Sequence, residues 1–115
     1  MKELQNKQDI QLLVDAFYQK VLNDELLSPF FQKIDFKLHQ PKMVHFWCFV
    51  LFDEPGYTTN VTQKHEHMKL SKVHFDRWLE LFNATTNALF IGEKAEKAKE
   101  RASILAWTMG SKFSQ

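Results

Sequence analysis

Apolar side chains recur every three or four residues along most of this chain. Ile10, Leu13, Phe17 and Val21 follow this rule over residues 9–23, and the spacing puts them on one face of a helix. Glycine and proline, which most often interrupt helices, occur only three times each in 115 residues. No segment alternates with the period of two expected of a half-buried strand. The sequence therefore predicts an all-α fold.

Four long helices and two shorter helical pieces are predicted. The long ones cover about residues 9–23, 37–52, 72–90 and 93–109, and the short pieces lie near 28–34 and 61–67. Ser71 is expected to cap the third long helix and Gly92 to end it. Pro41 is expected in the first turn of the second, where its missing N–H costs little. Without a linker or repeat between them, these elements predict a single domain over residues 1–115.

The charge and hydropathy of the chain exclude several classes of protein. Fifteen basic and fourteen acidic side chains give a net charge of +1, so the basic excess of a nucleic-acid-binding protein is missing. No stretch approaches the ~18 apolar residues of a membrane span, and the first residues lack the apolar run of a signal peptide. Cys48 is the sole cysteine, which excludes an internal disulfide and fits a reducing compartment. We therefore expect a soluble, cytoplasmic protein that binds neither nucleic acid nor membrane.

Histidine and aromatic residues are the strongest candidates for chemistry. The chain has five histidines and eleven phenylalanines. His65-Glu66-His67 lacks the spacing of a zinc-protease helix, and a lone cysteine does not favour a structural zinc site. The sequence has no glycine-rich phosphate loop and no nucleophile-elbow serine. Two interpretations remain: the aromatic side chains fill an ordinary core, or they wall a flat ligand that a histidine holds.

Several short motifs follow one another in a specific order over most of the chain. They are Phe17-Tyr18, Leu27-Ser28-Pro29-Phe30-Phe31, His39-Gln40-Pro41-Lys42-Met43, Phe46-Trp47, Lys64-His65, His74-Phe75-Asp76-Arg77-Trp78-Leu79-Glu80-Leu81-Phe82, and Ala95 to Ala98 with Arg101-Ala102. In this order and spacing they resemble the truncated haemoglobins, a family of shortened globins, and within it the third group. That group lacks the glycine pairs of other truncated globins, and the glycines of this chain are likewise isolated (Gly56, Gly92 and Gly110).

The resemblance implies a two-over-two sandwich of helices around a haem b cofactor, with the iron-binding histidine after a loop. His65 matches this ligand, because the family has Lys-His directly after the loop and an apolar residue three positions further on, here Met68. The imidazole would be neutral, with one nitrogen on iron and the other N–H donated to a carbonyl that fixes the ring. His67, two residues further on, is the competing ligand.

Three residues match the opposite, distal side of the family's haem pocket. The Tyr18 hydroxyl would donate a hydrogen bond to a diatomic ligand, and so would the indole N–H of Trp78, which is a donor only. His39 lies near a predicted helix start and would gate the pocket or hydrogen-bond weakly to the ligand. The alternative is that Tyr18 and Trp78 are ordinary packed side chains.

Further residues are expected to contact the haem through the same resemblance. Those expected to line the haem, or the core beneath it, are Phe30, Phe31, Met43, Phe46, Trp47, Phe75 and Phe82. Those expected to pair with the haem propionates are Lys42, Tyr57, Lys64 and Arg77. His45 and His74 are expected to be surface or packing residues. The chain departs from the family at residues 58–60, which lack a glycine turn, and at Lys69, where proline is frequent, and both departures bear on the rigidity of the ligand loop.

The resemblance implies a haem protein that binds a diatomic gas: oxygen first, then nitric oxide or carbon monoxide. Two donors at ~1.5–3 kcal/mol each would slow oxygen release by orders of magnitude, which suits redox chemistry better than simple transport. A peroxidase-like or nitric-oxide dioxygenase enzyme is therefore the alternative. Because the sequence has no flavin or nicotinamide motif, this enzyme would need a partner reductase. A helical interaction module without a cofactor is the third hypothesis. We expect a monomer or weak dimer.

Overall fold

The structure, a computed structural model, describes residues 1–56 and 70–113 of the chain. These residues form four long helices: α1 (Lys7–Leu22), α3 (Phe36–Phe52), α5 (Lys72–Leu89) and α6 (Glu93–Phe113). A single turn of helix, α2 (Ser28–Phe31), follows α1. The predicted all-α fold is confirmed. The helical piece predicted near residues 61–67 lies outside the described residues.

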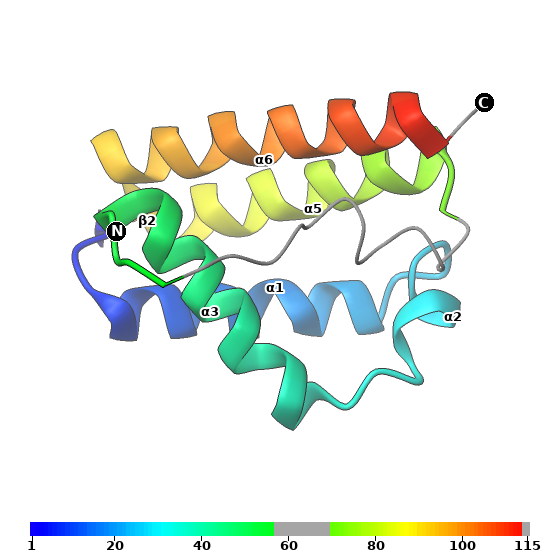
Figure 1. The fold of residues 1–115 in the computed structure, drawn as a ribbon, viewed down its shortest axis with the longest axis horizontal. Coiled ribbons are helices and arrows are strands. Elements are labelled where there is room, and N and C mark those ends of the chain that lie inside the picture. Colours follow the sequence, from blue (N-terminus) through cyan, green and yellow to red (C-terminus); the bar gives the residue numbers. More distant parts are fainter. Residues whose placement is uncertain (57–69, 114–115) are drawn as a thin grey trace.

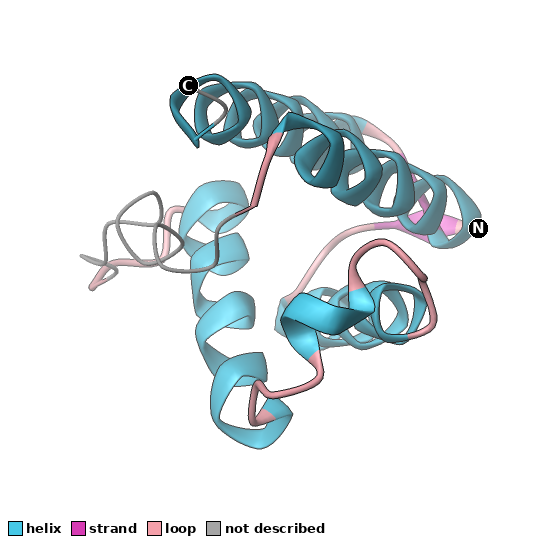
Figure 2. Ribbon diagram, turned by 90° about the vertical axis from the view of Figure 1, so that its right-hand side faces the viewer, coloured by secondary structure: helices cyan, strands magenta, loops and turns pink. Residues whose placement is uncertain are grey.

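The long helices pack as two layers. α5 and α6 run antiparallel, side by side, and form one layer above α1 in Figure 1. α3 crosses α1 obliquely and forms the second layer with it, as Figure 2 shows from the side. Among the described residues, no helix is long and apolar enough to cross a membrane. The arrangement is the two-over-two sandwich that the sequence resemblance implies.

Polar caps set where α1 and α3 begin. The Asn6 side chain accepts a hydrogen bond from the Asp9 backbone N–H (2.9 Å), so α1 starts at Lys7, two residues earlier than predicted. Asp35 accepts in the same way from the Lys37 N–H at 3.0 Å, and α3 starts at Phe36. The first-turn position predicted for Pro41 is therefore wrong, because Pro41 is the sixth residue of α3 and lies in its second turn.

The end of α5 differs from the prediction. α5 stops at Leu89, and the next two residues form a short strand, β2 (Phe90–Ile91), that pairs in parallel with β1 (Lys2–Glu3). Gly92 does not cap α5 but links β2 to α6 with a φ of 99°. This backbone angle favours glycine, and a Cβ there would also lie 3.1 Å from the Glu3 side chain, which would have to shift. Strands of two residues are too short to show a period of two in the sequence.

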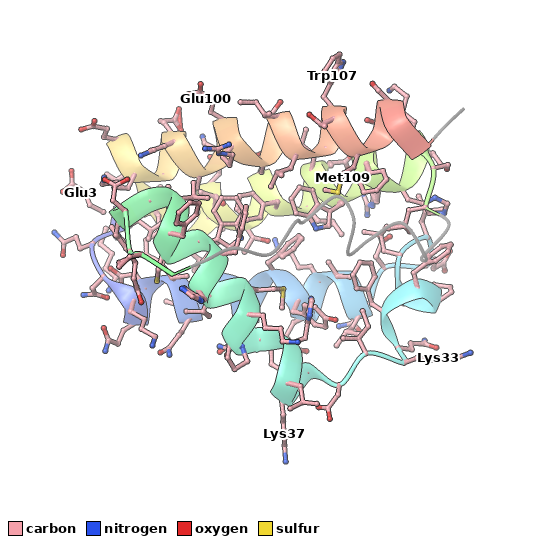
Figure 3. The ribbon with its side chains drawn as sticks, in the orientation of Figure 1. Glu3, Lys33, Lys37, Glu100, Trp107 and Met109 are labelled. Carbon is pink, nitrogen blue, oxygen red and sulfur yellow. The ribbon has the colours of Figure 1, made fainter. Side chains whose placement is uncertain are left out.

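The core lies between the two layers and is rich in aromatic rings. Small residues of α6, Ala95, Ala98 and Ala102, are each at most 1% exposed and allow the close approach of α5. At the far end of α6, Met109 is buried whereas Trp107 points away from the molecule (Figure 3). Leu105 is half-buried, while its neighbour Ala106 is buried.

Candidate functional site

Tyr18 lies at the centre of a small aromatic cluster between α1, α2 and the start of α3. Its ring centroid is 4.8 Å from that of Phe36, 6.0 Å from that of Phe31 and 6.2 Å from that of His39. We call these four residues the Tyr18 cluster. The N-cap at Asp35 begins α3 at Phe36, and this start brings Phe36 and His39, the first and fourth residues of α3, to the ring of Tyr18. The predicted distal residues Tyr18 and His39 are thus neighbours.

The hydroxyl of Tyr18 is buried and has no hydrogen-bond partner among the described residues. The side chain is only 3% exposed, and this burial raises the pKa of Tyr18 to about 12. The hydroxyl therefore stays protonated at neutral pH and keeps its proton available as a donor. A buried polar group without a partner costs about 1–3 kcal/mol, so a ligand that accepts this hydrogen bond would recover that energy.

A stack of three aromatic rings crosses the core from α5 to α3. Phe82 is stacked between Trp78 and Trp47, with centroid distances of 5.7 and 4.9 Å and interplanar angles of 16° and 19°. We call Trp47, Trp78 and Phe82 the aromatic stack. Phe17, next to Tyr18 in α1, meets the edges of both Trp78 (5.6 Å) and Phe82 (5.3 Å). Adjacent residues of α1 therefore touch the Tyr18 cluster and the aromatic stack.

The sequence of this chain matches that of a known protein family. A sequence model of the bacterial-like globin family matches residues 3–110. The chain belongs to the bacterial-like globins. It is accordingly a haem-binding globin, a family whose members take diatomic gases as ligands.

Two truncated haemoglobins are similar to this globin in sequence. It is 29% identical over 108 residues to group 3 truncated haemoglobin ctb of Campylobacter jejuni, a match that covers 88% of this chain and 85% of the relative. It is 32% identical over 90 residues to group 1 truncated haemoglobin of Tetrahymena pyriformis, covering 76% and 74% of the two chains.

Solved structures of the same two kinds of protein match the fold. The crystal structure of group III truncated haemoglobin from Campylobacter jejuni matches with a TM-score of 0.89 at 28% identity, over 100% of this chain and 97% of that one. The truncated haemoglobin of Tetrahymena pyriformis in its Fe(III) form matches with a TM-score of 0.75 at 25% identity, over 89% and 88%. The resemblance to third-group truncated haemoglobins is confirmed.

The residues predicted to wall the haem lie on α2, α3 and α5. Phe31, Trp47, Phe75 and Phe82 are buried, and Phe30, Met43 and Phe46 are half-buried, as is the predicted distal residue Trp78. The ring of Phe46 meets the ring of Trp47 edge to face at 5.1 Å. These side chains supply apolar walls on three helices, which is the surface a flat porphyrin requires. The same packing would also fill an ordinary core, and the family match is what favours the haem pocket.

The predicted propionate partners differ in how available they are to a propionate. Lys42 is exposed on α3. Arg77 already donates from Nε to Asp24 (2.7 Å) and from Nη1 to Glu80 (2.5 Å), so a propionate would compete with two carboxylates. Tyr57, Lys64 and the two ligand candidates His65 and His67 lie outside the described residues, and their roles stay predictions.

Two polar side chains near the site were not singled out from the sequence. Phe30 packs its ring against His74 at 4.7 Å, and the Nδ1 of His74 accepts a hydrogen bond from the Ser71 backbone N–H at 3.0 Å, which caps α5. Asp24 is a buried carboxylate in the turn after α1. Neither has a sequence signal of its own, because His74 stands where capping boxes usually have Glu or Gln and Asp24 lies in an irregular turn.

A groove of about 330 Å³ lies on another part of the surface, between α1 and α3. It is lined by Lys7, Gln11, Gln40, Pro41, Val44, His45, Cys48 and Glu54. None of the predicted haem contacts is among these residues. The Cys48 thiol at this groove is buried, and burial, together with the charge of Glu54, raises its pKa, so it is a poor nucleophile. The groove is separate from the candidate haem site.

Proposed function

We propose that this globin reversibly binds a diatomic gas, oxygen first, at a haem b whose iron is held by His65. The observation that carries the proposal is the hydroxyl of Tyr18, which is buried among aromatic rings and lacks a partner within the described part of the chain. A donor in this state fits a small acceptor that arrives with a ligand. It is not explained by the interpretation of Tyr18 as an ordinary packed ring, because packing alone does not need a buried hydroxyl.

The residues present fit a haem. We propose that His65 would hold its iron and that Met43, Phe46, Trp47 and Phe82 would be its apolar walls. Phe30 and Phe31 would extend these walls, and Lys42 and Tyr57 would be the partners of its propionates. When bound, the haem supplies the iron coordination position at which a gas is held.

The remaining chemistry belongs to the side chains of this globin. Tyr18 is protonated at neutral pH, and burial, which raises the pKa of its hydroxyl to about 12, keeps it so in alkaline solution as well; it therefore donates to the gas. Trp78 adds an indole N–H that donates only. The aromatic rings of the Tyr18 cluster exclude water, so each hydrogen bond to the gas is stronger than it would be in solvent. We propose His39 as the gate to this pocket, because it is half-buried and its ring centroid is 6.2 Å from that of Tyr18.

Oxygen release from the haem-loaded protein tests this role. Tyr18→Phe removes one hydroxyl and keeps the ring, and we expect release to be about tenfold to a hundredfold faster, since a hydrogen bond to a partly charged acceptor contributes about 1.5–3 kcal/mol. Trp78→Phe should also speed release. Trp107→Phe is the matched control, because it also replaces an indole by a phenyl ring, but Trp107 is 73% exposed on α6 and points away from the core.

The proposal has a clear contrary outcome. If Tyr18→Phe and Trp78→Phe release oxygen at the rate of Trp107→Phe, neither side chain donates to the gas. The distal part of the proposal is then wrong, even though the protein binds haem.

A further inference from the structure

An ion pair between a buried carboxylate and a half-buried arginine joins the two parts of the structure that carry the proposed donors. Asp24, directly after α1, is 9% exposed. Its Oδ2 accepts a hydrogen bond from the Leu27 backbone N–H at 3.1 Å, and its carbonyl accepts one from the Ser28 N–H at 2.8 Å. Asp24 therefore fixes the turn between α1 and α2.

The second oxygen of the same carboxylate reaches across to α5. Asp24 Oδ1 accepts from Arg77 Nε at 2.7 Å, although the residues are 53 positions apart in the sequence. Burial alone would raise the pKa of Asp24, but the hydrogen bonds from Arg77 and from backbone N–H groups lower it further than burial raises it. The carboxylate is therefore charged at neutral pH, and the pair is a true ion pair.

Each partner of this ion pair is linked to one proposed donor, Asp24 through α2 and Phe31, and Arg77 through the peptide chain. The turn that Asp24 fixes leads into α2, where the ring of Phe31 meets the edge of the Tyr18 ring. Arg77 precedes Trp78 in α5. The C-terminal end of α1, α2 and the first turns of α5 lie at the same end of the molecule (Figure 1). Phe17 against Trp78 is a second contact between these elements, but it is apolar and edge to face, and it fixes orientation less strictly than a charged hydrogen bond does.

We propose that Asp24 and Arg77 are a positioning pair that sets how Tyr18 and Trp78 are placed relative to each other, and hence how long the gas is held. The proposal rests on the proposed function. Hydrogen bonds weaken steeply with distance and angle, so a small shift of α5 against the turn after α1 weakens the donation from both side chains. Buried ion pairs are often not net stabilising, and fixing one geometry is a role that they do serve in some proteins.

The test uses the haem-loaded protein and the variant Asp24→Asn. Asparagine has nearly the same shape and caps turns well, so it keeps the bond to Leu27 but removes the charge that holds Arg77. We expect oxygen release to be about three- to tenfold faster, because the hydrogen bonds from Tyr18 and Trp78 to the gas would both be weakened but not lost. With carbon monoxide as the probe, its stretching frequency in the pocket should move in the direction that Tyr18→Phe produces. A change in folding stability alone does not produce that shift.

Glu80→Gln is the matched control. Glu80 is the other carboxylate on Arg77, but its side chain is 69% exposed, so its charge is screened and its loss should leave release and stretching frequency unchanged. Arg77→Met provides the second arm if Asp24→Asn folds poorly, because the Arg77 side chain is 37% exposed. In the double variant, Asp24→Asn with Arg77→Met, we expect no more than the larger single effect, because both changes break one interaction.

Three results would overturn the positioning role. The first is that Asp24→Asn has the same oxygen release rate and the same carbon monoxide stretching frequency as Glu80→Gln. The second is that the effects of the two substitutions add in the double variant. The third is faster haem loss confined to Arg77→Met, which would assign Arg77 to a propionate instead. A wild-type protein that takes up no haem overturns the proposed function itself, and that result is visible before any variant is made.

Discussion

Burial raises the pKa of each buried acidic group of this globin, but hydrogen bonds outweigh this effect at the carboxyls and not at Tyr18. Asp9 and Asp24 are buried carboxyls that stay charged, because each accepts hydrogen bonds from a basic side chain and from backbone N–H groups. Tyr18 is buried without such a partner, and burial raises its pKa to about 12, so it stays neutral. The carboxylates therefore fix backbone, while the hydroxyl is left available to a ligand.

Asp9 gives a prediction about acid stability. Burial would raise its pKa, but the bond from Lys2 (2.6 Å to Nζ) and the Gln5 N–H lower it further, so its pKa is below the unfolded value. The resulting stabilisation is complete above about pH 4, the unfolded pKa, and is lost as the pH falls through the folded pKa.

We expect Asp9→Asn to lower the free energy of unfolding by about 1 kcal/mol at pH 7, since charge-assisted bonds are lost and Lys2 is largely exposed. Urea unfolding from pH 7 to pH 2 measures this. The gap between wild type and Asp9→Asn should close at the acid end, and a gap that stays constant with pH would show that the charge of Asp9 contributes nothing.

Among the helices, the start of α5 matters most for the site, because α5 carries Trp78 and Phe82. Ser71 caps it as predicted, but the reciprocal bond comes from His74, whose Nδ1 accepts from the Ser71 N–H. His74 was predicted to be a surface or packing residue, and its ring does pack on Phe30. His74 thus joins the cap of α5 to Phe30 of α2, the neighbour of Phe31 in the Tyr18 cluster.

His74→Ala should destabilise the protein by about 1 kcal/mol, because it removes the cap and the ring contact together. Thermal unfolding at neutral pH measures the loss. Val73→Ala is the control, since Val73 is 57% exposed on the same turn and takes no part in the cap. Equal melting temperatures for the two variants would contradict a capping role for His74.

The helices could be predicted from the sequence, but their ends could not in full. The stripe of Ile10, Leu13 and Phe17 identifies α1 because apolar spacing directly reflects the buried face. Its start depends on which nearby side chain caps it; Asn6 does so, and Asp9 lies in the first turn. The pairing of β1 with β2 depends on a contact between residues about 88 positions apart, which no local pattern encodes.

At the scale of the molecule, the aromatic stack connects the two helical layers. Phe82 is 1% exposed and lies between Trp47 and Trp78, so it joins α5 to α3 through the centre of the sandwich. The sequence predicted these residues as walls of a pocket or core. It could not predict that they stack in this order, because the stacking follows from how two helices far apart in sequence cross.

Phe82→Ala should therefore cost about 3–5 kcal/mol of stability, as expected for truncating a large ring in a closed core. Chemical unfolding of the purified variant measures it. Trp107→Ala, a comparable truncation on the outer face of α6, should change stability by no more than about 0.5 kcal/mol. Similar losses in both variants would mean that the aromatic stack is not the centre of the core.

The two interpretations of that core, a pocket for haem or an ordinary aromatic interior, differ in what the protein does with porphyrin. The pocket interpretation requires the iron to be held by one imidazole, and His65 is the proposed one, with His67 two residues away. The interpretation without a cofactor predicts no response to haem at all.

Titration of the purified apoprotein with haemin, followed at the Soret band, therefore tests the central claim most directly. Wild type and His67→Ala should each take up one haem and give a sharp band, and His65→Ala should lose or greatly weaken it. A wild-type protein that stays colourless, or a band that survives in His65→Ala and disappears in His67→Ala, would contradict this account.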